Sequence, residues 1–351
     1  MIKIKKDERG ITLIALIITV IVLLILAGTA VSIAVNGGDI FGKATEAKED
    51  WNAKVAEEEQ NIIEVLQLAN GITTGNNGGV PTPILSEIVI SKEVPTNHES
   101  EFVGKYVDVD GNGTIDGIIY VDLLVQAGTT RQWHDEYGEY SIPSSQESGV
   151  TAETVKDYVI SQTSQTDARF DNTARDVVKL ATSQTNSNPV DRFYVMALED
   201  IKDSSNNTEL FWYYNAYDED NYEGKMYDYA TYTSEAFGKG RENTTKMLTK
   251  WESNGYGEQN DKDMWKWINV KPGQANDGWF VPSRAEWSAF GQAFDINGSN
   301  YTSFGVAGAY WSSSQGSYDD NAWWAHLLGG WMSDNGLVNE PGTSVRLSTT
   351  F

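Results

Sequence analysis

The stretch ITLIALIITVIVLLILAGTAVSIAV, residues 11–35, decides how the rest of the chain is organised. It holds no charged residue over 25 positions. As an α-helix it would be about 37 Å long, more than the roughly 30 Å of a bilayer core, so the pattern predicts a transmembrane helix. Basic residues precede it, at Lys3, Lys5, Lys6 and Arg9. Because such residues favour the cytoplasmic side, we expect the larger part of the chain to be extracellular, on the cell surface.

The short leader before this helix, residues 1–10, has an unusual place. A secretory signal carries an apolar core of about 7–15 residues with the cleavage site behind it. Here Arg9-Gly10 comes first and the apolar segment Ile11-Thr12-Leu13-Ile14 follows. This order resembles the leader of type IV prepilins. The resemblance implies a prepilin peptidase that cleaves after Gly10 and methylates the new amino terminus at Ile11. A plain N-terminal membrane anchor is the alternative.

One position departs from the pilin pattern. Pilins usually carry Glu at the fifth mature position, where it pairs with the terminal amine of a neighbouring subunit, and this chain has Ala15. A carboxylate in lipid is costly unless paired, so alanine removes that pairing between subunits. We still expect self-association into a filament, because Gly28, Thr29 and Ser32 allow close helix contact. A membrane-anchored receptor that never polymerises is the alternative.

Composition narrows the classes of function. Fifty acidic and 26 basic residues give a net charge of −24, which argues against nucleic acid as a partner. The absence of cysteine excludes disulfides and thiol catalysis. His98, His134 and His326 are far apart in sequence, and the chain has no Gly-x-Ser-x-Gly or nucleotide-binding loop. We therefore expect a protein that is not an enzyme.

The predicted fold class is α+β, with several segments after the membrane helix. Apolar residues at helical spacing predict an amphipathic helix over 36–70, and a Gly- and Pro-rich linker covers 71–83. A small β region over 84–150 precedes a polar connecting region over 151–189, where Thr151–Thr154 predicts a helix start. Residues 190–351 form the C-terminal module. One of the strands expected in this module covers residues 210–214.

Within the β region, an acidic loop has the spacing of a calcium site. Oxygen-bearing side chains occupy alternate positions, at Asp108, Asp110, Asn112, Thr114 and Asp116. Gly113 stands at the sixth position, as in calcium loops, and hard oxygen ligands at this spacing can wrap one Ca²⁺ ion. The twelfth position is Ile119 instead of the usual Glu. The alternatives are a Ca²⁺ site and an Asp/Asn/Gly-rich hairpin turn that needs no metal.

Three motifs characterise the C-terminal module: GWFVPSRAEW at 278–287, YWSSS at 310–314 and VRL at 345–347. In this order they resemble the C-type-lectin-like modules of the Fibrobacter-major-paralogous and related bacterial surface families, over residues 190–351. With the leader, the chain looks like pilin-like surface proteins of Gram-positive anaerobes. We expect Trp279, Trp287 and Trp311 in the core, a capping box between Ser283 and Glu286, and a buried carboxylate, with Glu286 as candidate, paired to Arg346.

Between the last two motifs, residues 315–342 mix aromatic, amide and acidic side chains with glycine, as binding loops do. The candidate ligand-binding residues are Tyr318, Asp319, Asn321, His326, Trp331, Ser333, Asp334, Asn335 and Asn339. Some lectin-like surface proteins are diversified by retroelements at this end, and the location agrees; ordinary loops on a lectin-like scaffold are the alternative. The ligand, protein or glycan, stays open, because the chain has no E-P-N or Q-P-D triplet.

Overall fold

The computed structural model describes residues 88–182, 186–214, 232–253, 259–270, 278–318, 321–337 and 342–351. Residues Leu85–Phe351 form one compact unit. The expected leader with Gly10 and Ile11, the apolar helix, the amphipathic helix and the linker lie outside the described residues. Among the residues that are described, no helix is both long and apolar enough to cross a membrane.

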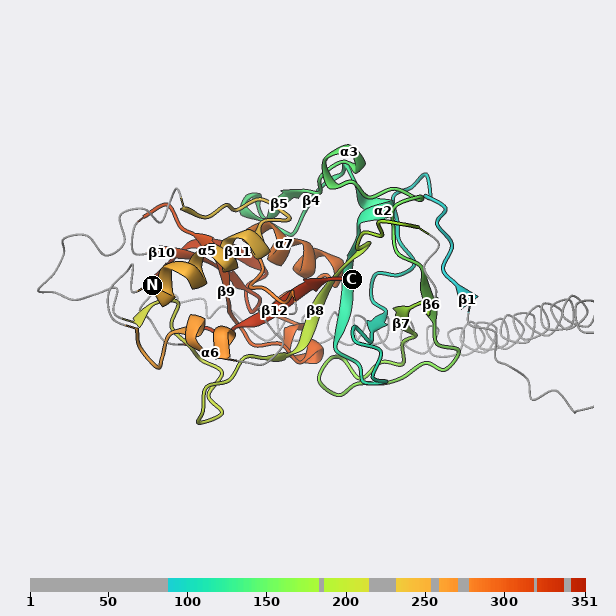
Figure 1. The fold of residues 1–351 in the computed structure, drawn as a ribbon. Helices are drawn as coiled ribbons and strands as arrows, with labels where there is room; N and C mark the ends of the chain where they lie inside the picture. Colours follow the sequence, from blue (N-terminus) through green and yellow to red (C-terminus); the bar gives the residue numbers. More distant parts are fainter. Residues whose placement is uncertain are drawn as a thin grey trace, which may run out of the picture. The chain divides into compact units, whose positions relative to one another are not determined.

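A seven-stranded sheet forms the centre of this unit (Figure 1). Its strands, in spatial order, are β1 (Ile88–Val89), β6 (Tyr158–Ile160), β7 (Val177–Leu180), β2 (Tyr106–Val107), β3 (Gly117–Asp122), β8 (Phe193–Asp200) and β12 (Arg346–Thr350). All neighbouring pairs are antiparallel except β2 and β7. All six residues of β3 and the first six of β8 are buried, so the middle of the sheet is covered on both faces.

The sheet unites segments that the sequence separates. The expected β region supplies β1 to β3, the polar region 151–189 supplies β6 and β7, and the C-terminal module supplies β8 and β12. The divisions at 150 and 190 therefore fall inside one sheet. The predicted helix start at Thr151–Thr154 is wrong, because these residues form a turn before Val155, which bridges Val190.

A second sheet, ordered β11-β10-β9, comes entirely from the C-terminal module. It consists of β9 (Tyr310–Gln315), β10 (Asn321–His326) and β11 (Trp331–Leu337). A two-stranded ribbon pairs β4 (Thr130–Gln132) with β5 (Glu139–Ser141). The strand expected at 210–214 is absent: Phe211 only bridges Asp263, and Trp212 is held in the core by donating from Nε1 to Ser312 O at 2.8 Å.

In the described part of the chain the helices are few and mostly short. They are α2 (Leu123–Gln126), η1 (Glu136–Gly138), α3 (Ser145–Ser148), α5 (Gly240–Glu252), α6 (Met264–Val270), α7 (Arg284–Ala293) and η3 (Tyr301–Phe304). The structure is thus a mixture of α and β that is rich in sheet. Helix α7 begins with the expected capping box, in which Ser283 Oγ accepts from Glu286 N and the Glu286 carboxylate accepts from Ser283 N.

Helix α7 packs against both sheets, within the largest hydrophobic core of the described residues. Phe290 meets Tyr120 of β3 edge to face, with ring centroids 5.9 Å apart, and Trp287 stacks on Tyr310 of β9 at 4.7 Å. Trp133, which follows β4, donates from Nε1 to Ile296 O at 2.9 Å, just beyond α7. Figure 1 shows β4 and β5 lying beside α7. Trp287 and Trp311 are buried as expected, and Trp279 is only partly buried.

The expected pairing of Arg346 with Glu286 is wrong. Glu286 is fully occupied by backbone donors, because Oε2 accepts from Ser283 N and Oε1 accepts from Gly238 N and Gly240 N. Arg346 instead pairs with Asp200, which the register of β12 against β8 places opposite it.

Candidate functional site

The hairpin of β10 and β11 gathers most of the ligand-binding residues expected from the sequence. Its register pairs Trp324 with Ser333 and His326 with Trp331, and residues directly opposite each other in an antiparallel pair project to the same face. Asn335 joins them, because Trp324 Nε1 lies 3.4 Å from its Oδ1. We call these residues, Trp324, His326, Trp331, Ser333 and Asn335, the aromatic face.

The three rings of the aromatic face are in mutual contact. The centroids of His326 and Trp331 are 4.3 Å apart with a tilt of 39°, and Trp324 lies 5.1 Å from His326 and 5.8 Å from Trp331. Each of the three residues is half-buried. Trp324 also packs against the core that contains Trp311. The core therefore holds the rings in place on one side, and the part of each ring that is not buried faces solvent.

Polar groups border these rings. Asn335 is exposed, and its Oδ1 accepts hydrogen bonds from Ser333 Oγ and Trp324 Nε1. His326 Nδ1 is buried and has no hydrogen-bond partner among the described residues. Burial lowers the pKa of His326, so its imidazole is neutral at pH 7. The aromatic face thus carries no formal charge on its own side chains at neutral pH.

Two glycines make room for the rings. A Cβ atom on Gly329 would lie 2.1 Å from Trp331 Nε1 and 2.4 Å from His326 Nδ1. A Cβ atom on Gly336 would lie 2.9 Å from Trp324 Cδ1 and 2.7 Å from Trp311 Cζ3. Any side chain at either position would displace an aromatic ring, so the arrangement depends on glycine in the hairpin itself.

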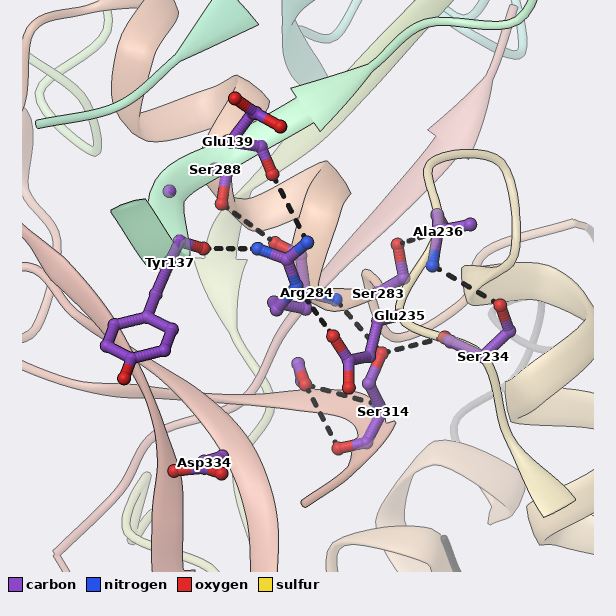
Figure 2. Close-up of polar contacts among 12 residues, drawn as sticks. Tyr137, Glu139, Ser234, Glu235, Ala236, Ser283, Arg284, Ser288, Ser314 and Asp334 are labelled. Carbon is purple, nitrogen blue, oxygen red and sulfur yellow. Dashed lines mark hydrogen bonds and ion pairs between the residues drawn. The ribbon is translucent and has the colours of Figure 1, made fainter. Parts of the chain in front are cut away.

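Arg284, the first residue of α7, contacts the hairpin through Trp323, and Figure 2 shows its polar contacts with neighbouring segments. Its guanidinium donates to Tyr137 O and, at 3.2 Å, to Glu139 O, and its Nε lies 3.1 Å from Glu235 Oε2. Its central carbon also lies 5.3 Å from the ring centroid of Trp323. These contacts engage the guanidinium of Arg284. Arg284 therefore stabilises the face of the hairpin opposite the aromatic face and is not placed to contact a ligand there.

The remaining expected residues are more scattered. Tyr318 is 67% exposed in the turn before β10, Asn321 is buried, and Asp334 accepts from Ser317 Oγ at 2.6 Å. Asp319 and Asn339 lie outside the described residues. Sequence reasoning missed Trp324. The sequence feature that could have identified it is the Trp323-Trp324 pair in a strand. Successive side chains of a strand point to opposite faces, so one of the two rings faces the core and the other faces outward. Trp323 faces the core and is 5% exposed.

The acidic loop forms the turn between β2 and β3, where Val107 pairs with Gly117. Carboxylate oxygens of Asp108, Asp110 and Asp116 lie within 4.8 Å of one another. Asn112 makes local bonds, with Oδ1 accepting from Thr114 N and Nδ2 donating to Asp110 Oδ2 at 2.8 Å. The loop is therefore the turn of a β-hairpin, with or without a metal ion, and it brings together three of the five side chains expected to bind one.

The chain was also compared with known proteins. No protein-family model matches it, and neither does any curated protein or any solved structure.

Proposed function

We propose that this protein is a type IV pilin-like surface protein whose aromatic face binds an extracellular ligand. The single observation that carries the binding function is the cluster of Trp324, His326 and Trp331, half-exposed on a hairpin whose other side is fixed in the core. Rigid aromatic side chains lose little conformational entropy when a ligand covers them, so such a surface suits binding. The prepilin-like leader supports display at the cell surface.

The chemistry of the face favours a neutral glycan. Tryptophan rings pack against the apolar faces of sugar rings, and Ser333 and Asn335 border these rings with a hydroxyl and an amide for sugar hydroxyl groups. A net charge of −24 disfavours polyanionic ligands. A protein epitope is the second candidate, because mixed Trp, Asn and Ser surfaces also bind proteins.

Binding to glycan and protein arrays tests this proposal. Trp331→Ala and Asn335→Ala each remove part of the aromatic face, and each should weaken every true hit at least tenfold. The matched control is Trp267→Ala, which removes a half-buried tryptophan on α6, outside the face. Near-ultraviolet circular dichroism checks that the variants fold. Hits unaffected by both face variants would show that the contact surface lies elsewhere, and hits only among proteins would overturn the glycan assignment.

Filament assembly is a separate part of the proposal. Electron microscopy of material sheared from producing cells, with an antibody to the C-terminal module, should reveal labelled thin filaments whose subunit begins at methylated Ile11. The membrane-anchored receptor is the alternative that Ala15 favours. Label confined to the cell membrane, on a chain that keeps residues 1–10, would support that receptor and exclude the pilin.

A further inference from the structure

We propose that the loop between β2 and β3 binds one Ca²⁺ ion through Asp108, Asp110 and Asp116. The three carboxylates come from the first, third and ninth positions of one loop, and the structure brings an oxygen of each within 4.8 Å of the others. This separation lets one ion contact all three at the usual Ca²⁺–oxygen distances of about 2.3–2.6 Å. The inference is independent of the aromatic face.

The strongest sign of a missing partner is Asp108. This residue is only 5% exposed, and its Oδ2 accepts a hydrogen bond from Gly113 N at 2.9 Å. Its Oδ1 is buried and has no hydrogen-bond partner among the described residues. A buried carboxylate oxygen without a partner is costly, so native proteins nearly always satisfy it. A cation held between the three carboxylates would satisfy it.

The charged residues around the loop also favour a bound cation. Among the described residues, no lysine or arginine forms an ion pair with Asp108, Asp110 or Asp116. Arg169, the cation that reaches the loop, donates to Ile115 O and pairs with Asp167 and Glu199. Three carboxylates this close repel one another unless a cation stands between them.

The ligand set selects the ion. Only oxygen donors are present, which suits Ca²⁺ or Mg²⁺ and disfavours zinc or copper. A short, Gly-rich turn with Gly111 and Gly113 at positive φ can adapt to the larger, less regular shell of calcium. Because Ile119 replaces the bidentate Glu and lies within β3, we expect a Kd of about 0.1–1 mM, in the range of extracellular calcium modules.

Binding of calcium to the loop would also stabilise the large sheet. Asp116 Oδ2 accepts from Val109 N at 2.7 Å, and its main-chain oxygen accepts from Leu198 N of β8 at 3.3 Å. An ion on Asp116 therefore fixes the turn that joins β2 to β3 and, through β8, the middle of the large sheet. We expect calcium to raise the melting temperature of the protein.

The test is calorimetric titration and thermal melting of the full chain, purified in detergent and treated with chelator. Calcium at 10 mM should bind with heat and raise Tm by about 3 °C or more. Asp110→Asn, at an exposed position, removes one negative charge but keeps an oxygen ligand, so it should weaken calcium binding at least about tenfold and reduce the Tm shift, as should Asp108→Asn. The control is Asp203→Asn, in another Asp/Asn-rich turn, where Asp203 Oδ1 accepts from Ser205 N and Asn207 N; this variant should keep both effects.

The proposal is overturned if the wild-type chain shows neither heat nor a Tm shift at 10 mM calcium. It is also overturned if Asp110→Asn responds as the wild type does. An equal response to Mg²⁺ would overturn the assignment to calcium. Asp110→Asn keeps the test decisive should the buried Asp108→Asn variant fail to fold, because Asp110 is exposed and, among the described residues, its side chain accepts hydrogen bonds from Asn112 alone.

Discussion

Arg346 Nε donates a hydrogen bond to Asp200 Oδ1 at 2.6 Å, deep between β12 and β8. The side chain of Arg346 is 2% exposed and that of Asp200 is 14% exposed. Tyr310 OH donates to the same carboxylate at 3.0 Å, and Arg346 Nη2 donates to Gly305 O. The pair therefore ties the last strand of the large sheet to β9 of the small one.

Arg346→Leu should destabilise the protein by about 3–5 kcal/mol, because it leaves the largely buried Asp200 carboxylate without its cationic partner. Denaturant unfolding followed by tryptophan fluorescence measures this loss. Arg241→Leu is the control: it removes an exposed arginine that contacts Phe280 and Thr350, and it should cost no more than about 1 kcal/mol. Equal unfolding midpoints for the two variants would contradict a structural role for the pair.

Glu286 should make stability fall as the pH rises. Burial raises its pKa to about 7, although backbone N–H groups of Ser283, Gly240 and Gly238 oppose the shift. Between the ordinary value of 4.5 and about 7, the unfolded chain releases this proton while the folded chain keeps it. The free energy of unfolding therefore decreases over that window, by about 3 kcal/mol for 2.5 units, and is constant with respect to this group below and above it.

Glu286→Gln should lack this pH dependence, which unfolding at several pH values between 4 and 8 measures. The chain supplies a matched control in its second capping box, Ser144–Glu147, which lies on the exposed α3. Hydrogen bonds from Ser144 lower the pKa of Glu147, so Glu147→Gln should leave the decrease between pH 4.5 and 7 in place. A wild-type profile that rises across that window would refute the assignment.

Gly329→Ala should disturb the aromatic face without removing any of its functional groups. The new Cβ would collide with Trp331 Nε1 and His326 Nδ1, so the rings must move apart. We expect an altered near-ultraviolet circular dichroism spectrum, a loss of about 1–2 kcal/mol in stability and at least tenfold weaker ligand binding. Gly308→Ala is the control, since its Cβ would make only ordinary van der Waals contacts, with Leu328 Cβ at 3.6 Å and Tyr301 Cε2 at 4.0 Å. An unchanged spectrum for Gly329→Ala would mean that the rings are not held as described.

A fragment that starts at residue 190 should not fold by itself. It would lose β3, which pairs with β8 from Phe193 to Ala197, and it would lose Trp133 from the surface of α7. Its free β8 edge and uncovered core would favour aggregation. A fragment of residues 85–351 should melt cooperatively in calorimetry. Cooperative melting of both fragments would show instead that the C-terminal module is autonomous.

Local signals in the sequence predicted some of these features. The capping box that begins α7, between Ser283 and Glu286, follows from the sequence alone. The strands β6 and β7 had no comparable signal, because their segment is largely polar and β7 pairs in parallel with β2, about 71 residues away in the chain as Lys105 and Asp176 show. Such pairing is decided by the whole sheet and cannot be seen in a short window.

Composition was sufficient to propose the region of the candidate site, but it did not predict which of its residues face outward. That depends on the pairing of strands, as it does for β6 and β7. Aromatic and amide residues in 315–342 pointed to the hairpin that carries the aromatic face. Which of Trp323 and Trp324 faces outward, however, depends on the register that sets Trp324 against Trp311 and Ser333. The partner of Arg346 likewise depends on the register of β12 with β8. Both are long-range facts that spacing within a motif does not contain.

The hydrogen bond between Tyr120 OH and Ser348 Oγ joins residues that are 228 positions apart, across β3, β8 and β12. Closing so long a loop adds little to the equilibrium cost, since closure entropy grows only with the logarithm of length. It does slow folding, because contacts of high sequence separation form late. While β12 is still missing, nascent chains present the apolar edge of β8 to one another. Yields on refolding should therefore depend more strongly on protein concentration than on the final stability of the sheet.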